Sequence, residues 1–227
     1  MILKKKIIFF SLVLYLSLII GFYFGEDSLG AALTDYYSIA EITEKFKDNF
    51  LFTLLNYDTL GRRQSPIFSI LNSLFFDYSD LFRRLFVLHI YLLIPLYFYK
   101  CLKIKYRNVP KDYLRLFAGI ILLFPTFRSY SIWPDPHLLG TLFFIISIFY
   151  YLKTSVDNKP FKNSLLNIFF LSLAAYVSPN FGMFVIYFYY KFYKKFNFSN
   201  NIIIITFLNI LLSLPFFYYL FYLDINF

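Results

Sequence analysis

Residues 7–24, IIFFSLVLYLSLIIGFYF, decide the fold class, because this run contains no charged residue. A helix of about 20 apolar residues is long enough to cross the hydrocarbon core of a bilayer. Lys4, Lys5 and Lys6 precede the run, which exceeds the apolar part of a typical signal peptide and has no small-residue cleavage site after it. The sequence therefore predicts an uncleaved first membrane span.

The composition of the whole chain agrees with a membrane protein. Hydrophobic residues make up 59% of the sequence and aromatic residues 25%, and the mean hydropathy is +0.61. A soluble domain contains about 45–50% apolar residues, and a core cannot absorb the excess. The net charge of +9 comes from short basic clusters between apolar runs, as in topology signals, so we expect no nucleic-acid partner. Cys101, the single cysteine, excludes an internal disulfide.

Further apolar runs follow the first one, and we interpret each as a span. They are Leu81–Tyr99, Tyr113–Phe127, Leu138–Leu152, Leu165–Val177, Phe181–Phe192 and Ile202–Leu223. The lysine clusters lie in alternate joints between these runs, and cytoplasmic loops are enriched in lysine and arginine. We therefore predict an all-α, multi-pass protein of the plasma (inner) membrane. It has about seven transmembrane helices in one module, 1–227, and a cytoplasmic N-terminus.

The stretch 25–80, between the first two predicted spans, holds most of the acidic residues and is expected outside. Within it, Asp35–Leu55 has apolar residues three to four positions apart, which predicts an amphipathic helix along the membrane surface. Glu41 and Lys45 form a favourable pair on its polar face. Pro66–Phe76 is apolar but reaches only about 16 Å as a helix, so we predict a re-entrant or interfacial helix.

Two outer aspartates are candidates for chemistry, and each has a structural alternative. Asp35 either caps the start of the surface helix or acts as a catalytic carboxylate. Asp135, in Trp133-Pro134-Asp135-Pro136-His137, either caps the helix that Pro136 begins or belongs to a polar site beside His137.

The outer arginines are candidate ligands for phosphate. Arg62, Arg63 and Arg128 either anchor the protein at lipid headgroups or clamp a phosphate group, which suits guanidinium geometry. Asp27 is an alternative outer carboxylate to Asp35. A lone histidine within a span, His89, is interpreted as a packing residue. Asn209, in the last predicted span, is interpreted as a donor to a neighbouring helix.

The order of these features resembles the GT-C class of membrane glycosyltransferases, most of all the branch with lipid A aminoarabinose transferases and protein O-mannosyltransferases. The matching pieces are DYYSIAEI at 35–42, RQSPI at 63–67, and the Pro-Asp-Pro turn around Asp135. An arginine just inside the next span corresponds to Arg83 or Arg84. The resemblance covers about residues 1–180. Members of the class usually continue further, which implies a C-terminally incomplete chain.

The resemblance implies transfer of a sugar from a polyprenyl-phosphate donor to an acceptor at the extracytoplasmic face. Asp35 would then be the base and Asp135 would position the acceptor, while Arg62, Arg63 and Arg128 would hold the phosphate, with His137 and Asp27 as further substrate contacts. The expected partners are this donor and membrane lipids. No cofactor is implied, although a divalent cation shared by Asp35 and Asp135 is left open.

Two other classes of function are compatible with the sequence. A transporter or flippase would also be multi-pass with outer charges, but paired repeats typical of transporters are not evident. A non-catalytic membrane subunit is the third alternative. The sequence indicates neither the sugar, the acceptor and the lipid length nor the oligomeric state.

Overall fold

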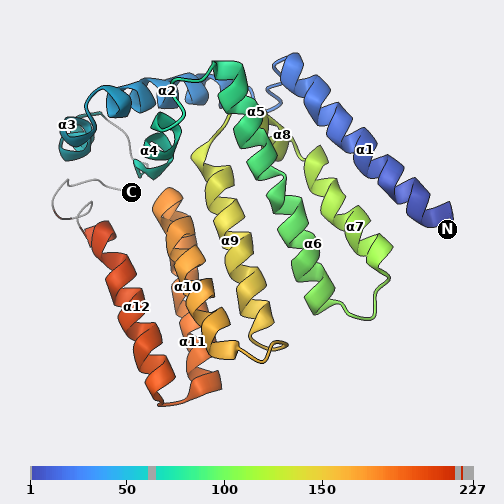
Figure 1. The fold of residues 1–227 in the computed structure, drawn as a ribbon, viewed down its shortest axis with the longest axis vertical. Coiled ribbons are helices and arrows are strands. Elements are labelled where there is room, and N and C mark those ends of the chain that lie inside the picture. The colour runs from blue at the N-terminus through green and yellow to red at the C-terminus, as the bar shows by residue number, and fades with distance from the viewer. Residues whose placement is uncertain (1, 61–64, 218–220, 222–227) are drawn as a thin grey trace.

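The computed structural model describes residues 2–60, 65–217 and 221, and the part that it describes contains helices and no strand (Figure 1). The N-terminal part has one long helix followed by several short ones. These are α1 (Ile2–Tyr23), α2 (Ala32–Asp48), α3 (Phe50–Leu55), the 3-10 helix η1 (Tyr57–Leu60) and α4 (Ile67–Ser73).

The rest of the chain consists of helices that run roughly along the long axis of the molecule. They are α5 (Asp80–Tyr91), α6 (Leu93–Lys105), α7 (Lys111–Gly119), η2 (Ile120–Leu123), α8 (Pro125–Ile132), α9 (Pro136–Lys153), α10 (Pro160–Val177), η3 (Pro179–Met183), α11 (Phe184–Phe196) and α12 (Asn200–Phe217). In contrast, α2 lies across one end of this bundle (Figure 1).

Three helical segments are long and apolar enough to cross a membrane: Asp80–Lys105, Pro136–Lys153 and Asn200–Phe217. A shorter apolar helix covers Phe9–Tyr23. Only 11% of the last long segment is buried inside the protein, so most of its apolar surface is not covered by the described residues. Such a surface is stable in a bilayer and costly in water. The protein thus has the character of a membrane protein. Seven spans were predicted, whereas three of the described helical segments are both long enough and apolar enough to cross a membrane.

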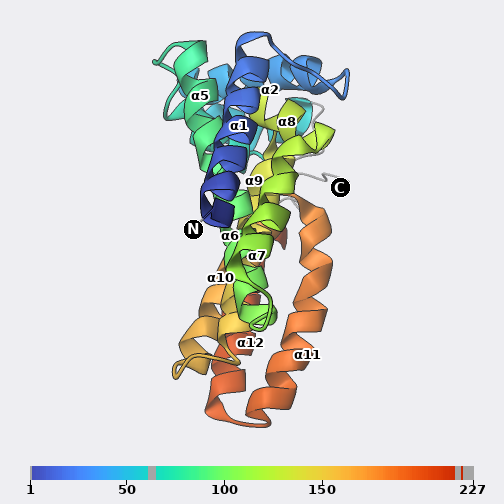
Figure 2. The same cartoon turned by 90° about the vertical axis from the view of Figure 1, so that its right-hand side faces the viewer.

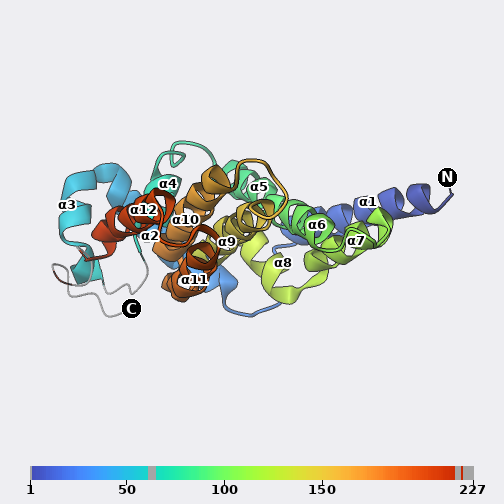
Figure 3. The ribbon, with the colours of Figure 1, turned by 90° about the horizontal axis from the view of Figure 1, so that it is seen from below.

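Two buried clusters hold the bundle together. The larger one joins α1, α2, α5, α8 and α9, and includes Leu18, Leu88 and Ile132, which are fully buried. The second joins α10, α11 and α12 around Leu171 and Phe192. Helices α9 and α10 form the most extensive contact and link the two clusters. Seen from below, the helices form an elongated array with α1 at one end and α12 towards the other (Figure 3).

The predicted helix Asp35–Leu55 is wrong as a single element. The observed helix α2 begins earlier, at Ala32, and ends at Asp48. It ends there because the backbone of Asn49 is not helical and the Asn49 side chain caps the next helix, α3, by accepting a hydrogen bond from the backbone N–H of Phe52. The predicted apolar face is confirmed for α2, where Ile39, Ile42 and Phe46 are buried. The Glu41–Lys45 pair is also present, at 2.9 Å.

The predicted span Tyr113–Phe127 is also interrupted. Helix α7 ends at Gly119, η2 follows, and Phe124 is extended before α8 begins. Pro125 explains the break, because proline disfavours a helical conformation in the residue before it and suits the first position of a new helix.

The predicted run Leu81–Tyr99 is divided at Leu92 into α5 and α6, and Phe181–Phe192 starts as η3 before α11. Pro66–Phe76 is present as the shorter α4, whereas α10 begins at Pro160 and is therefore longer than expected. The predicted run Ile202–Leu223 is helical as α12 up to Phe217, and residues 218–220 and 222–223 of that run lie outside the described residues.

The lysine-rich joints and α2 lie at opposite ends of the molecule (Figures 1 and 2). The joints α6–α7, α9–α10 and α11–α12 are at the lower end in both views, whereas α2, α4, α8 and the start of α5 lie at the upper end. We call the upper end the α2 end. The predicted separation of the acidic stretch 25–80 from the lysine-rich joints therefore corresponds to two physical ends of the bundle.

A polar contact inside the apolar bundle gives a first prediction. Asn167 on α10 is fully buried, and its Nδ2 donates to the carbonyl oxygen of Ser147 on α9 over 2.8 Å. We expect Asn167→Ala to lower the free energy of unfolding in detergent by about 1 kcal/mol, since interhelical hydrogen bonds in apolar surroundings contribute about that much. Thermal unfolding followed by circular dichroism measures it. Asn158→Ala, at an exposed turn position, is the control, and equal stability of both variants would contradict the assignment.

Candidate functional site

The start of α5 gathers charges at the α2 end. Ser79 caps the helix by accepting a hydrogen bond from the backbone N–H of Phe82. Asp80 is in the first turn, where a carboxylate interacts favourably with the helix dipole. Its carboxylate oxygens lie 3.3 Å from Nη2 of Arg83 and 3.8 Å from Nη1 of Arg84. The hydroxyl of Tyr36, on α2, also donates to Asp80, so this carboxylate links α2 to α5.

Arg84 is held among aromatic rings at the junction of three helices. Its guanidinium carbon lies 3.5 Å from the ring centroid of Trp133 and 4.8 Å from that of Phe22. Its Nε donates to the carbonyl oxygen of Ile132 over 2.9 Å. Cation–π contacts of this kind are strongest where the cation is desolvated, and the Arg84 side chain is only 12% exposed. Arg84 is therefore a fixed positive charge rather than a mobile surface one.

Both arginines retain an unused donor. Nε of Arg83 and Nη2 of Arg84 are buried and have no hydrogen-bond partner among the described residues. The two side chains line a cavity of about 20 Å³ between α2, α4 and α5, large enough for one water molecule. An unsatisfied buried donor on a charged group is costly, so the arrangement favours an anionic or other acceptor ligand at this point.

An apolar groove of about 250 Å³ continues from this cavity and shares Phe68, Asn72, Arg83 and Val87 with it. The groove runs along α5 from Phe82 to Tyr91, about 13 Å of helix. Its remaining wall comes from α4 and α9. Several of its lining side chains are also exposed on the outside of the protein, namely Leu71, Phe75, Phe82 and Phe86. The groove thus opens sideways, and Arg83 lies at its charged end.

Asp35 does not cap α2, so that interpretation is wrong. The helix begins three residues before it, and the capping is done by Asp27, whose Oδ2 accepts from the backbone N–H of Leu33 and whose Oδ1 accepts from that of Gly30. The positive φ of Gly30, 77°, suits this tight turn. The half-buried side chain of Asp35 makes no hydrogen bond or ion pair with the described residues.

Asp135 caps α9 as predicted. Its Oδ1 accepts a hydrogen bond of 2.7 Å from the backbone N–H of His137, and Pro136 takes the first helical position. Asp135 is 3% exposed, and its own carbonyl oxygen accepts from the buried hydroxyl of Tyr91. His137 is exposed, and its Nδ1 lies 3.3 Å from the hydroxyl oxygen of Ser178. The polar-site interpretation of Asp135 stays a prediction beside the confirmed cap.

Tyr130, on α8, is influenced by three of the carboxylates considered above. Burial is the main reason that the pKa of Tyr130 is raised, and the negative charges of Asp135, Asp35 and Asp27 raise this pKa further. Its ring centroid is 6.4 Å from that of His137. Asp35 and Asp135 therefore both act on the Tyr130 hydroxyl. Within the described residues, no three acidic, histidine or cysteine side chains are close enough to hold a metal ion.

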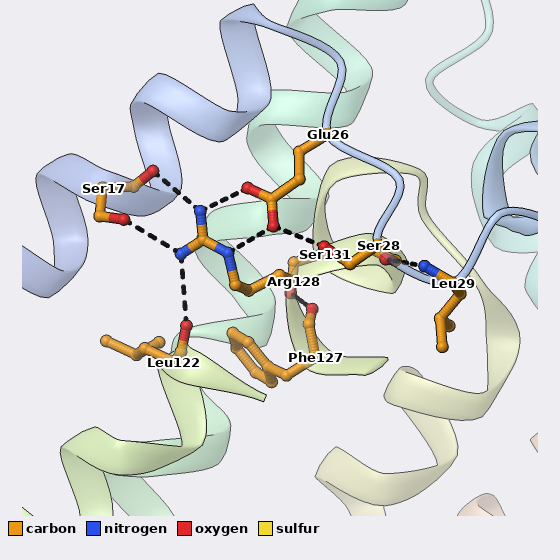
Figure 4. A network of polar contacts seen from close by, with 9 residues as sticks. Ser17, Glu26, Ser28, Leu29, Leu122, Phe127, Arg128 and Ser131 are labelled. Atoms are coloured by element: carbon orange, nitrogen blue, oxygen red, sulfur yellow. Dashed lines mark hydrogen bonds and ion pairs between the residues drawn. The ribbon is translucent and has the colours of Figure 1, made fainter. Parts of the chain in front are cut away.

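Arg128 is fully engaged by the protein itself (Figure 4). Its guanidinium makes a bidentate contact with Glu26, through Nε at 2.7 Å and Nη2 at 2.5 Å, and also donates to the hydroxyl and carbonyl oxygens of Ser17. This hydrogen bonding lowers the pKa of Glu26. Gly21 permits the close approach, since an added Cβ would lie 2.3 Å from the Glu26 carboxylate. The described contacts therefore make Arg128 a tie between α1 and α8.

The other predicted phosphate ligands, Arg62 and Arg63, lie outside the described residues. Sequence reasoning did not single out Tyr130 or Tyr91. In a chain with 22 tyrosines, neither residue stands out by composition or spacing. The sequence places Arg83 and Arg84 at the start of the second predicted span, and the resemblance matches one of the two to an arginine of the family.

The described residues form an all-helical protein with three helices long and apolar enough to cross a membrane, and its α2 end places buried arginines beside an apolar groove. No protein-family model, curated protein sequence or solved structure matches the chain.

The Glu26–Arg128 pair predicts a pH-dependent stability. Because the pKa of Glu26 is lowered in the folded protein, its stabilising effect is complete above the unfolded-state pKa near 4.5 and is lost as the pH falls through the lower folded-state pKa. We expect Glu26→Gln to lower the free energy of unfolding by about 1–2 kcal/mol at neutral pH, and the difference to shrink in acid.

Thermal unfolding of the two proteins in detergent, from about pH 7 to about pH 3, measures this difference. Glu44→Gln, at an exposed position of α2, is the matched control. A Glu26→Gln effect that stays constant over the whole range would contradict the role of the ionised pair.

Proposed function

We propose that this chain is a multi-pass membrane glycosyltransferase that moves a sugar from a polyprenyl-phosphate donor to an acceptor at the extracytoplasmic face. The observation that carries the proposal is the unused guanidinium donors of Arg83, which lines both the small cavity and the apolar groove, and of Arg84, which lines the small cavity. A polyprenyl phosphate has the same two parts, an anionic group and a long hydrocarbon tail. The sideways opening suits a tail that enters from the bilayer.

The phosphate would be held by Arg83, which reaches both the small cavity and the groove. The cavity between α2, α4 and α5 is too small for a phosphate, so binding requires Arg83 to turn from Asp80 towards the groove. Arg84 would stay in place and supply positive charge, because three aromatic rings and a carbonyl oxygen fix it. The proposal thus moves the phosphate contact from Arg128 to the arginines of α5.

Asp35 is proposed as the base that takes the proton of the acceptor hydroxyl. It remains uncommitted to the fold, because Asp27 performs the capping of α2. Its neighbour Tyr36 lines the small cavity, and both Asp35 and Asp135 influence the pKa of Tyr130. A carboxylate serves as a base at neutral pH, and the departing polyprenyl phosphate needs no strong acid. Asp135 and His137 would contact the acceptor.

The proposed topology places the α2 end outside and the lysine-rich joints in the cytoplasm, with seven passes. In this arrangement α5 and α6 form one pass, α7 and η2 another, and the remaining passes are α1, α9, α10, α11 and α12. The location of the lysine-rich joints at the end opposite α2 supports it.

Removal of the Arg83 charge should strongly reduce transfer from the polyprenyl-phosphate sugar. We expect Arg83→Gln to reduce kcat/KM for a radiolabelled polyprenyl-phosphate sugar about 100-fold. A hydrogen-bond donor that stabilises the charge on a reacting group typically raises the rate by about that factor. The full-length chain in liposomes is the sample. The matched control is Arg115→Gln on α7, an arginine that is also paired to an aspartate but lies away from the α2 end. Equal loss in both variants would contradict the proposed phosphate contact.

A separate test concerns the base. Asp35→Asn should reduce kcat at least about 100-fold while donor binding is retained, because general bases contribute about 10²–10⁴ to the rate. Asp27→Asn is the comparison, since the asparagine oxygen can still accept one of the two backbone hydrogen bonds that Asp27 accepts before and at the start of α2. Equal transfer by wild type and Asp35→Asn would remove Asp35 from the mechanism. Donor binding or movement across the bilayer without any transfer would instead support a carrier or flippase.

A further inference from the structure

A second cavity lies at some distance from the groove along α5, between α10, η3, α11 and α12. Its volume is about 550 Å³, in the range of small-molecule sites in proteins. The cavity is lined by Ser172, Ala175, Tyr176, Pro179, Gly182, Met183, Val185, Asn209, Ile210, Leu212, Ser213 and Phe216. It shares no lining residue with the groove or the small cavity.

The chemistry of this lining excludes a charged ligand. None of its residues carries a charge, and most are apolar. A phosphate or carboxylate would lack any partner for its charge there, at a cost of several kcal/mol or more. The occupant is therefore neutral and mainly apolar, which separates it from the polyprenyl-phosphate donor.

Two polar groups on facing helices point to a particular functional group. The hydroxyl of Ser172, on α10, makes no hydrogen bond with the described residues. The carboxamide of Asn209, on α12, donates through Nδ2 to the carbonyl oxygen of Ile205, which leaves its Oδ1 unused. One turn after Ser172, Tyr176 also lines the cavity, and its hydroxyl is buried without a partner among the described residues.

An alcohol matches these groups. A hydroxyl group can donate to the Asn209 Oδ1 and accept from the Ser172 hydroxyl at the same time, whereas an ester or ketone can only accept. In apolar surroundings an unsatisfied amide oxygen is costly, so a ligand that donates to it is favoured over a plain hydrocarbon chain. Asn209 lies about two turns or more from either end of α12, so a ligand group that reaches it has to be neutral and to enter the apolar layer.

We propose that the cavity between α10, η3, α11 and α12 binds a neutral lipid with a free hydroxyl group, such as a long-chain alcohol. The hydrocarbon chain occupies the apolar lining, and the hydroxyl bridges Ser172 and Asn209. The site does not depend on the proposed glycosyl transfer, because it shares no residue with the groove or the outer carboxylates.

The experiment uses the full chain purified in detergent and a long-chain alcohol that carries a photoreactive diazirine. Irradiation should label peptides of α10, α11 or α12, and unlabelled alcohol should compete. The matched methyl ether and the alkane of equal length should compete about fivefold less well, as one lost hydrogen bond predicts. Equal competition by all three would show non-specific filling by hydrocarbon and overturn the proposal.

Three variants locate the site. Ser172→Ala and Asn209→Leu should each lower the affinity for the alcohol about fivefold, and Asn209→Leu should also remove the preference over the ether, because the ether lacks only the hydrogen bond to Asn209. Gly182→Phe should block labelling altogether, because an added Cβ meets only the Cβ of Ala175, at 3.8 Å, and the ring can fill the cavity. Asn201→Ala, on α12 but outside the cavity, is the control. Unchanged labelling of a folded Gly182→Phe protein would place the ligand elsewhere.

Discussion

A buried guanidinium group needs acceptors on several sides, and this requirement organises the α2 end of the protein. Arg128 satisfies it with Glu26, Ser17 and the carbonyl oxygen of Leu122, which belong to three different segments. The contacts fix the loop after α1 against α8.

Arg84 is placed by a different means, because its positive charge is balanced mainly by aromatic rings. Phe22, Tyr36 and Trp133 come from α1, α2 and the turn after α8, and they surround one guanidinium. With the ion pair to Asp80 stretched to 3.8 Å, one donor is left unused. The packing that stabilises this junction therefore also leaves one N–H donor of Arg84 unused in the small cavity. Because the apolar groove adjoins this cavity, the α2 end combines an unused positively charged donor with an apolar surface.

Asp27 and Asp35 differ in whether the fold uses their carboxylates. Asp27 and Asp35 were both candidates for an outer carboxylate. Asp27 accepts two backbone N–H groups at the start of α2, so its carboxylate is committed to the turn. Asp35 is one turn further into the helix, too late to cap it, and its side chain keeps its hydrogen-bonding capacity. A one-turn shift in where a helix begins thus decides which residue is available to a substrate.

The sequence by itself determined the helical class, the membrane character and most helix positions, because uncharged apolar runs and proline starts act over short distances along the chain. Pro136 with Asp135, and the apolar face of α2, are examples that need no tertiary information. The break at Asn49 was missed because the apolar spacing continues to Phe50, although that side chain is exposed once the helix turns. Only the tertiary structure decided which charged side chains have all their hydrogen-bonding groups satisfied by the protein itself. Arg128 and Arg84 are alike in the sequence, and partners about 50 to 110 residues away make one a tie between helices and the other part of a candidate site.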